Sequence, residues 1–261
     1  MTSIFSLPQV SKRAIKVWRR NLDVFLKTWK VNFFPPFIEA LLYLTAIGLG
    51  IGTYVGVIDG IPYVMYIAPA ILAISVMNSA FFECTYGSYV RMYYQKSFDA
   101  IIATPLSIED VIAGELLWGA TRSVISVTIM LPVLVAFGVI SLPFSLLAIP
   151  LAFLAGLMFA GLAMCFTAIT PSIDTLNYPS FLFITPMMLF SGTFFPLSVL
   201  PLVIQYIALA IFPLTHLVAL MRMATLPSAG PLLALNLIWI LAATVIFCVI
   251  SINLMRRRLI V

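Results

Sequence analysis

The sequence contains very few charged residues. Only 9% of its 261 residues are Asp, Glu, Lys or Arg, whereas 63% are hydrophobic and the mean hydropathy is +1.15. A soluble domain carries about 25% charged residues, so this chain cannot build a water-exposed surface. The composition excludes a soluble enzyme and a nucleic-acid-binding domain. The net charge of +5 does not change this, because the basic residues lie in clusters beside apolar segments.

The residues that usually carry chemistry are also scarce. The chain has one histidine, His216, and its three cysteines lie inside apolar stretches with no CxxC or metal-ligand spacing. No phosphate-binding loop of the GxxxxGK[ST] type occurs. We therefore expect no catalytic site, no disulfide framework, no metal and no cofactor in this chain, and no ATP-binding site of its own.

Long apolar segments make up most of what is present. A transmembrane helix needs roughly 20 apolar residues to cross a bilayer. The sequence has room for six, and it therefore predicts an all-α polytopic membrane protein with one transmembrane domain over residues 1–261. The expected spans are residues 33–57, 63–90, 111–140, 146–169, a segment starting near Tyr178, and 231–254.

An amphipathic segment, residues 5–30, precedes the first span. Apolar residues recur there at spacings of three and four, and seven Lys and Arg residues occupy much of the rest. Basic residues opposite a face with Trp and Phe are typical of a helix that lies in the membrane interface. Two interpretations stay open at this point: a lipid anchor, or an anchor that also contacts a partner.

Prolines interrupt the apolar run from 178 to 221. Between Pro201 and Pro213 lie 11 residues, or roughly 16 Å of helix, which is too short to cross the bilayer. Broken backbone at membrane depth is tolerated where protein or a water-filled cavity surrounds it. The sequence therefore predicts that the fifth span is followed by short re-entrant helices at 194–212 on the outer side.

The distribution of basic residues predicts the orientation. With both termini in the cytoplasm, twelve of the 14 Lys and Arg residues fall on the cytoplasmic side, in the N-terminal segment, in the loop 91–110 and at the C-terminal end. A seventh crossing would place the C-terminal arginines outside. Six spans with both ends cytoplasmic is the expected topology.

Four ionisable residues lie within the expected spans, namely Glu39, Glu83, Glu115 and Arg122. Such residues usually face the bundle interior or a cavity. Glu115 and Arg122 are two helical turns apart on one face, so either can pair with the other or with Glu83. A static packing pair and a proton relay both remain open.

Small residues suggest close packing in the first span. Gly48, Gly52 and Gly56 repeat every four residues and form a smooth stripe. Such stripes let two helix backbones approach closely. We expect these glycines to pack against a second copy of the chain in a homodimer.

Three segments resemble a known family: FDAIIATPLSIEDVIAGELLW (98–118), MLFSGTFFPLSVLP (188–201) and FPLTHLVALMR (212–222). They are similar to the permease subunits of type-two ABC exporters, and within that class to the nodulation-factor (NodJ-type) lipooligosaccharide export permeases. The resemblance covers essentially the whole chain. It implies a permease homodimer in the bacterial cytoplasmic (inner) membrane, in contact with membrane lipids, that exports an amphipathic, lipid-like substrate. Two copies of a separate ABC ATPase subunit would bind ATP and magnesium.

The resemblance also implies two functional regions. A cytoplasmic coupling helix at 93–103, within the coupling segment 91–110, would insert into a groove of the ATPase. Its apolar face would be Phe98, Ile101 and Ile102, and its charged rim Arg91, Lys96 and Asp99. The outer gate region would contain Phe194, Phe195, Pro196, Pro201 and His216.

Other functions remain open at this point. A drug or polysaccharide exporter of the same class would fit the same features. A proton-coupled secondary transporter would use Glu39, Glu83 or Glu115, but such transporters usually show an internal repeat, and none is visible in the sequence.

Overall fold

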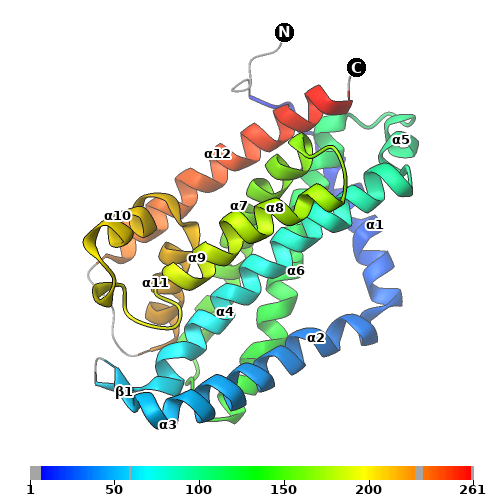
Figure 1. The fold of residues 1–261 in the computed structure, drawn as a ribbon. Coiled ribbons are helices and arrows are strands. Elements are labelled where there is room, and N and C mark those ends of the chain that lie inside the picture. The colour runs from blue at the N-terminus through cyan, green and yellow to red at the C-terminus, as the bar shows by residue number, and fades with distance from the viewer. Residues whose placement is uncertain (1–6, 59, 227–231, 260–261) are drawn as a thin grey trace.

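The computed structural model describes residues 7–58, 60–226 and 232–259. The regular secondary structure of the described residues is helical, apart from a two-stranded antiparallel ribbon of β1 (Val57–Ile58) and β2 (Ile61–Pro62). Within the described ranges, five helices are long and apolar enough to cross a membrane, and a bent helix pair raises the number to six. The prediction of an all-α multi-pass membrane protein is confirmed (Figure 1).

The long spans are composite helices. The first combines α2 (Trp29–Leu42), η1 (Tyr43–Ile51) and α3 (Gly52–Val55), and the second α4 (Tyr63–Phe82), η2 (Glu83–Gly87) and η3 (Val90–Tyr94). The others are α6 (Ile108–Ala136), η4 (Phe144–Leu147) with α7 (Ala148–Ile169), and α12 (Leu233–Leu259). The second span ends at Tyr94 rather than near residue 90, which brings Arg91 into the helix.

Helix α4 forms the centre of the bundle and packs against α6, α7 and α11 (Pro213–Thr225). Glycines permit this close packing. A Cβ added at Gly119 would lie 2.6 Å from the Cys84 sulfur, and one added at Gly156 would lie 2.8 Å from the Cβ of Ser123. Because neither position has room for a side chain, α4, α6 and α7 pack with their backbones close together.

Helix α6 begins three residues before the expected span 111–140, at a capping box. The Ser107 hydroxyl accepts a hydrogen bond from the Asp110 backbone N–H at 3.1 Å, and the Asp110 carboxylate accepts one from the Ser107 backbone N–H at 3.4 Å. This reciprocal capping box satisfies two of the backbone donors that a helix start leaves free. The helix therefore begins at Ile108.

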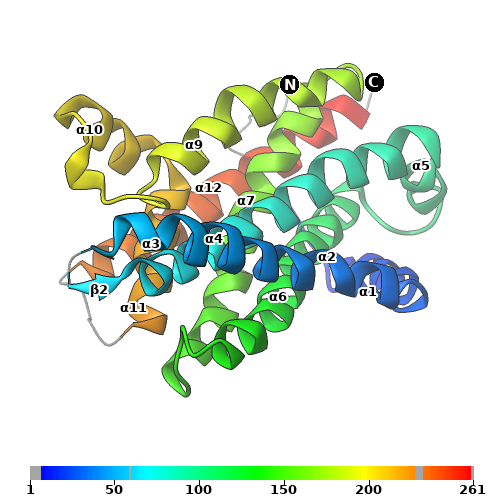
Figure 2. The ribbon, with the colours of Figure 1, turned by 60° about the horizontal axis from the view of Figure 1, so that its bottom comes forward.

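The amphipathic segment forms α1 (Ala14–Lys27), which lies beside α6 (Figure 2). Ala14 and Val17 are buried, and a Cβ added at Gly114 of α6 would lie 2.6 Å from the Cβ of Val17. The Trp18 indole N–H donates to the Thr121 hydroxyl at 2.8 Å. Part of the apolar face thus packs on the protein itself, so α1 is more than a lipid anchor.

The two ends of the bundle differ. One end, here called the basic end, contains α5 (Ser97–Ile102), the start of α1 and the last turn of α12 (Figure 1). There the Glu109 carboxylate accepts from the Gln9 backbone N–H at 2.5 Å and from Arg256 at 2.9 Å, which ties both chain ends to α6. The opposite end, the ribbon end, contains β1, β2 and α10 (Leu202–Ile211).

The broken fifth span differs in detail from the prediction. Helices α8 (Asn177–Pro179), η6 (Ser180–Ile184) and α9 (Thr185–Phe190) form one run of roughly 21 Å, followed by the loop 191–196 and η7 (Leu197–Val199). The bent pair is α10 and α11, which meet at 85°. Helix α10 ends at Ile211 and α11 begins at Pro213, on either side of the expected boundary at 212; at the first helical position the missing N–H of proline costs nothing.

The glycine stripe of the first span packs inside the chain. A Cβ added at Gly48 would lie 3.3 Å from Val64, and one at Gly52 would lie 3.6 Å from Tyr63, both on α4. Gly56 has φ +72° and ends α3. The short ribbon returns the chain at once, so the nearest neighbour of Gly48 and Gly52 within the chain is the next helix; contact of the stripe with a second copy stays a prediction.

Candidate functional site

Four charged side chains form a continuous ion network near the basic end. The Arg91 guanidinium of η3 lies 2.7 Å from the Glu83 carboxylate of η2 and 2.5 Å from the Glu115 carboxylate of α6. Arg122 of α6 lies 3.4 Å from the other oxygen of Glu83. Of the pairings that the sequence left open, the structure selects Arg122 with Glu83, and it pairs Glu115 with Arg91 instead.

Glu115 is the buried centre of this network, with none of its surface exposed. It also accepts hydrogen bonds at 2.8 Å from the Asn21 amide of α1 and from the Ser88 hydroxyl. A buried charge is tolerated when it is paired and its remaining lone pairs are satisfied, which these partners achieve. The network therefore joins α1, α4 with its η2–η3 continuation, and α6.

Asn21 and Arg91 were not recognised from the sequence as members of this network. Asn21 follows Ala14 and Val17 at spacings of seven and four, so it occupies a buried position of an otherwise apolar stripe. A polar residue at such a position was the available signal. Arg91 was assigned to the rim of the coupling helix, and that assignment is wrong because the second span continues through it and turns its side chain inward.

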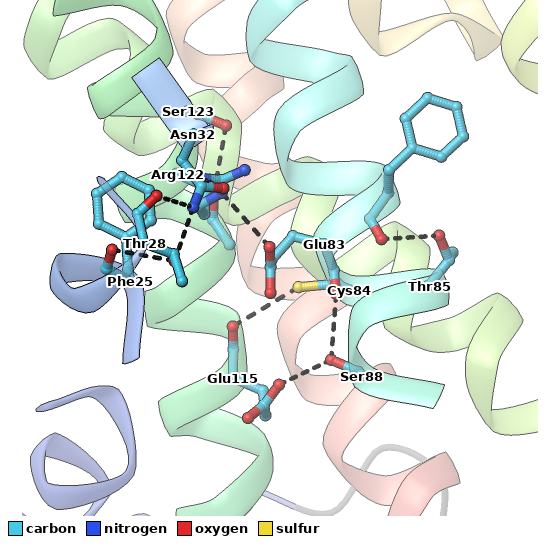
Figure 3. Close-up of polar contacts among 12 residues, drawn as sticks. Phe25, Thr28, Asn32, Glu83, Cys84, Thr85, Ser88, Glu115, Arg122 and Ser123 are labelled. Atoms are coloured by element: carbon cyan, nitrogen blue, oxygen red, sulfur yellow. Dashed lines mark hydrogen bonds and ion pairs between the residues drawn. The ribbon is translucent and has the colours of Figure 1, made fainter. Parts of the chain in front are cut away.

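Arg122 connects the network to the N-terminal helices. Figure 3 shows its side chain between Glu83 of η2, Asn32 of α2 and Phe25 of α1. It donates to the Asn32 carbonyl oxygen at 3.2 Å and lies 5.1 Å from the centre of the Phe25 ring. The cation is therefore held by a carboxylate, an amide and an aromatic face.

Two cavities adjoin this network. The first, here called the arginine cavity, has a volume of about 420 Å³ and is lined by side chains from α1, the start of α2, η2–η3 and α6, including Arg20, Arg91 and Arg122. Burial lowers the pKa of Arg20 from its usual value. The second cavity, of about 400 Å³, shares Glu83 and Arg122 with the first and extends along α2 and α4. The two cavities are therefore neighbours, and charged side chains line both in an otherwise apolar bundle.

Glu39 lies apart from the network, in α2, and lines the second cavity. Among the described residues, no Lys, Arg or His lies within ion-pair distance of its carboxylate. Glu39 faces a cavity, which is one of the two environments expected from the sequence. It is not part of the ion network that contains Glu83, Glu115 and Arg122.

The coupling segment is smaller and more closely attached than predicted. Helix α5 comprises six residues, after Lys96 in the left-handed conformation (φ 49°). Phe98 is completely buried in the core of its own chain, and Ile101 and Ile102 pack partly against it. Phe98 therefore cannot be the side chain that inserts into a partner groove in this conformation, because a short amphipathic helix next to a bundle buries its apolar face there.

The exposed surface of this segment is polar and aromatic. Lys96 and Asp99 are exposed, as the sequence predicts for a charged rim. Tyr93 and Tyr94 are each 61% exposed, and their rings contact one another at 5.6 Å. These four residues, rather than Phe98 and Arg91, form the outward face.

The expected gate region at the ribbon end is held by three residues that the sequence did not single out. The Tyr66 hydroxyl and the Arg222 guanidinium both donate to the Gly192 carbonyl, at 3.2 and 2.6 Å, and Arg222 lies 3.9 Å above the Tyr66 ring. The Tyr63 hydroxyl donates to the Phe194 carbonyl at 3.2 Å. The loop 191–196 is thereby fixed to α4 and α11.

His216 has a structural environment. Its ring is buried, stacks on Trp239 of α12 at 4.3 Å, and places its two nitrogens 2.7 Å from the Asn236 side chain and 3.0 Å from the Leu209 carbonyl. It joins α10, α11 and α12. Of the other expected gate residues, Phe194, Phe195 and Pro196 are partly buried, whereas Pro201 is exposed.

No group of three or more His, Cys, Asp or Glu side chains in the described part of the chain is arranged to hold a metal ion. The three cysteines are free. What the site can do is mechanical and electrostatic: it fixes helices to one another and provides a charged cavity.

These features define a multi-pass membrane protein of the transport type. The family model for "ABC-2 type transporter" matches residues 14–226. The chain belongs to the ABC-2 type transporter family, as a transmembrane permease subunit without a nucleotide-binding domain. Permeases of this family work with ATPase subunits.

Curated relatives cover nearly the whole chain. Nodulation protein J of Sinorhizobium fredii (strain NBRC 101917 / NGR234) is 36% identical over 94% of this chain and 93% of the relative. Nodulation protein J of Rhizobium meliloti (strain 1021) is 33% identical over 98% of this chain and 97% of the relative. The inner membrane transport permease YadH of Escherichia coli (strain K12) is 28% identical over 71% and 72%.

Proposed function

We propose that this permease exports an amphipathic lipid-linked oligosaccharide or lipooligosaccharide across the cytoplasmic membrane of a bacterium, as a homodimer bound to two copies of a separate ABC ATPase. The observation that carries this proposal is the near-full-length similarity to nodulation protein J. The second cavity beside an apolar bundle supports an amphipathic substrate, since its amide and hydroxyl side chains offer contacts for a sugar group.

Both termini lie on the cytoplasmic side in this proposal. The basic end contains α1 with its Lys and Arg residues, α5 and the arginines of the last turn of α12. Short cytoplasmic segments carry an excess of Lys and Arg, which supports placing this end inside. The loop 191–196 and the ribbon then face outward.

The ATPase contact is the outward face of the coupling segment. Tyr93, Tyr94, Lys96 and Asp99 are among its exposed side chains, and tyrosine is enriched at protein interfaces because it combines a large apolar ring with a polar tip. Movement of this face would also move Arg91, because Arg91 and Tyr93 lie in the same short helix, η3. Arg91 contacts Glu115 of α6, and Glu115 contacts Asn21 of α1, so both helices would respond.

Glu39 supports a second candidate, a proton-coupled transporter, because this carboxylate lines a cavity without a basic partner in the described part of the chain. The two candidates differ in their need for an ATPase. The test is to purify the chain with and without its partner ABC ATPase, and to measure uptake of a fluorescent lipooligosaccharide into inverted vesicles.

Transport that requires ATP and the ATPase supports the export proposal. Transport driven by a proton gradient in vesicles that lack the ATPase would contradict it. The variant Glu39→Gln separates the two, because it should abolish proton-driven transport and leave ATP-driven transport intact. Drugs and polysaccharides in the same assay test the alternative substrates.

A further inference from the structure

The walls of the arginine cavity are typical of a site near the lipid headgroups. Helix α1 forms one wall, and it carries the basic residues and exposed apolar side chains of a helix in the membrane interface. Ser97 of α5 and Gln95 line the cavity on the basic end. A ligand in this cavity would therefore be at the membrane surface, where polar headgroups and water meet.

The charges around the cavity do not balance. Three guanidinium groups, Arg20, Arg91 and Arg122, face the two carboxylates of the network, Glu83 and Glu115, which leaves a charge of +1. Arg91 is occupied by both carboxylates. Excess positive charge in a partly buried cavity is unfavourable unless an anion or water compensates it.

Arg20 and Arg122 retain free donors. Among the described residues no carboxylate lies within 4.0 Å of Arg20, whose hydrogen bond goes to the neutral Asn21 side chain at 3.0 Å. In Arg122 the buried Nε faces Glu83 at 3.4 Å and Nη1 donates to Asn32, whereas Nη2 makes no hydrogen bond to a described group. Both side chains belong to the wall of the same cavity.

The chemistry of these donors selects the ligand. Guanidinium groups bind phosphate oxygens through paired N–H donors, more strongly than neutral groups do. A volume of about 420 Å³ is at the small end of ligand pockets, so it suits a headgroup rather than a whole lipid. Val24, Phe25 and Trp118 supply an apolar wall for the carbon chain next to that headgroup.

We propose that the arginine cavity binds the phosphate group of an anionic amphiphile in the cytoplasmic leaflet, with Arg20 and Arg122 as its ligands. The site is separate from the identity of the exported substrate: a membrane phospholipid would occupy it in a permease for any cargo. Because Arg122 also belongs to the ion network, occupancy would couple the lipid to the helices that this network joins.

The test measures binding to the purified full-length permease in nanodiscs of zwitterionic lipid. The probe is dioctanoyl phosphatidic acid, with dioctanoyl glycerol as the uncharged analogue and inorganic phosphate as the free anion. The critical variant is Arg20→Gln. The matched control is Arg19→Gln, which removes the same charge from the adjacent, exposed position of α1.

We expect Arg20→Gln to weaken phosphatidic acid binding about tenfold or more, as loss of a hydrogen bond to a charged group does. Arg19→Gln should stay within about twofold, since an exposed charge acts weakly. Arg20→Lys, which keeps the charge and the fold, should be intermediate. Equal binding by wild type and Arg20→Gln, or equal losses in Arg19→Gln and Arg20→Gln, would overturn the site.

The probes identify the source of the phosphate. Binding of phosphatidic acid with neither dioctanoyl glycerol nor inorganic phosphate competing supports the lipid site. If inorganic phosphate at equal concentration displaces phosphatidic acid, the cavity binds free anions and the proposal of a lipid site is wrong. If dioctanoyl glycerol binds as well as phosphatidic acid, the cavity recognises the chain and the proposal is wrong.

Discussion

Replacing Glu115 by Gln tests whether the ion network holds the bundle together. The change keeps the shape of the side chain and removes a buried negative charge that Arg91 contacts at 2.5 Å. Arg91 and Arg122 would then share a single carboxylate, Glu83. The network would be left with two positive groups and one negative group, and thus a net charge of +1. Removing one member of a buried ion pair costs about 3–5 kcal/mol, because the partner stays buried without its counter-charge.

The assay is thermal unfolding of the purified permease in detergent, followed by its intrinsic fluorescence. For a chain of this size, a loss of that magnitude corresponds to a fall in Tm of roughly 6–20 °C. The control is Asp23→Asn, which removes an exposed carboxylate of α1 that forms no ion pair with a described residue. A surface substitution of this kind changes stability by about 0.5 kcal/mol or less, so the control should barely move Tm.

Similar Tm values for the two variants would refute the reasoning, because the buried position would then have no special role. A double-mutant cycle with Arg91→Gln refines the result. If the two side chains act as a pair, the double variant loses less stability than the sum of the single variants. Additive losses would show that each residue acts through its other contacts, such as Asn21 and Ser88 on Glu115.

Three further predictions concern other parts of the molecule. Phe98→Ala should destabilise the permease by about 3–5 kcal/mol in the same unfolding assay, since it removes a fully buried ring. Tyr93→Ala, at an exposed position, should leave Tm unchanged and reduce co-purification of the ATPase. If Phe98→Ala instead left Tm intact and released the ATPase, the assignment of the two faces would be reversed. Gly119→Val should prevent correct assembly, seen as loss of the monodisperse peak in gel filtration, because that position has no room for a Cβ. Arg222→Gln should speed cleavage of the loop 191–196 by an added protease, because the loop loses its 2.6 Å contact at Gly192; an unchanged cleavage rate would show that α4 alone holds the loop.

The sequence predicts the parts of the fold that depend on local rules. Span lengths follow from hydropathy, and the start of α6 follows from Ser107 and Asp110, because a capping box acts over four residues. The prediction that intramembrane charges face the interior is confirmed for Glu115, which is fully buried. A charged side chain facing the lipid would have no polar partner, so such residues face the bundle interior or a cavity. These rules need no knowledge of which helices are neighbours.

The sequence predictions differ from the structure where the packing partner of a helix face determines the result. An apolar face such as that of Phe98 can be buried in a partner or in its own bundle, and the periodicity of the sequence is the same in both cases. The glycine stripe of the first span has the same ambiguity, and Gly48 packs against α4 of the same chain. Arg91 follows an apolar span directly, and hydropathy alone does not show that the helix continues through it to the acids of η2 and α6.

Helix α4 and its continuation connect the two ends of the permease. At the basic end Glu83 and Arg91 belong to the ion network, and at the ribbon end Tyr63 and Tyr66 hold the loop 191–196. The two ends differ in local structure, because η2 and η3 are π-helical whereas α4 itself is a regular helix. π-helical turns are rare and occur frequently at functional sites, since their wider hydrogen bonds give the backbone room to change. Under the proposed function, a displacement of the coupling segment would reach Arg91 and Glu83 first, and α4 connects these residues to Tyr63 and Tyr66 at the loop 191–196.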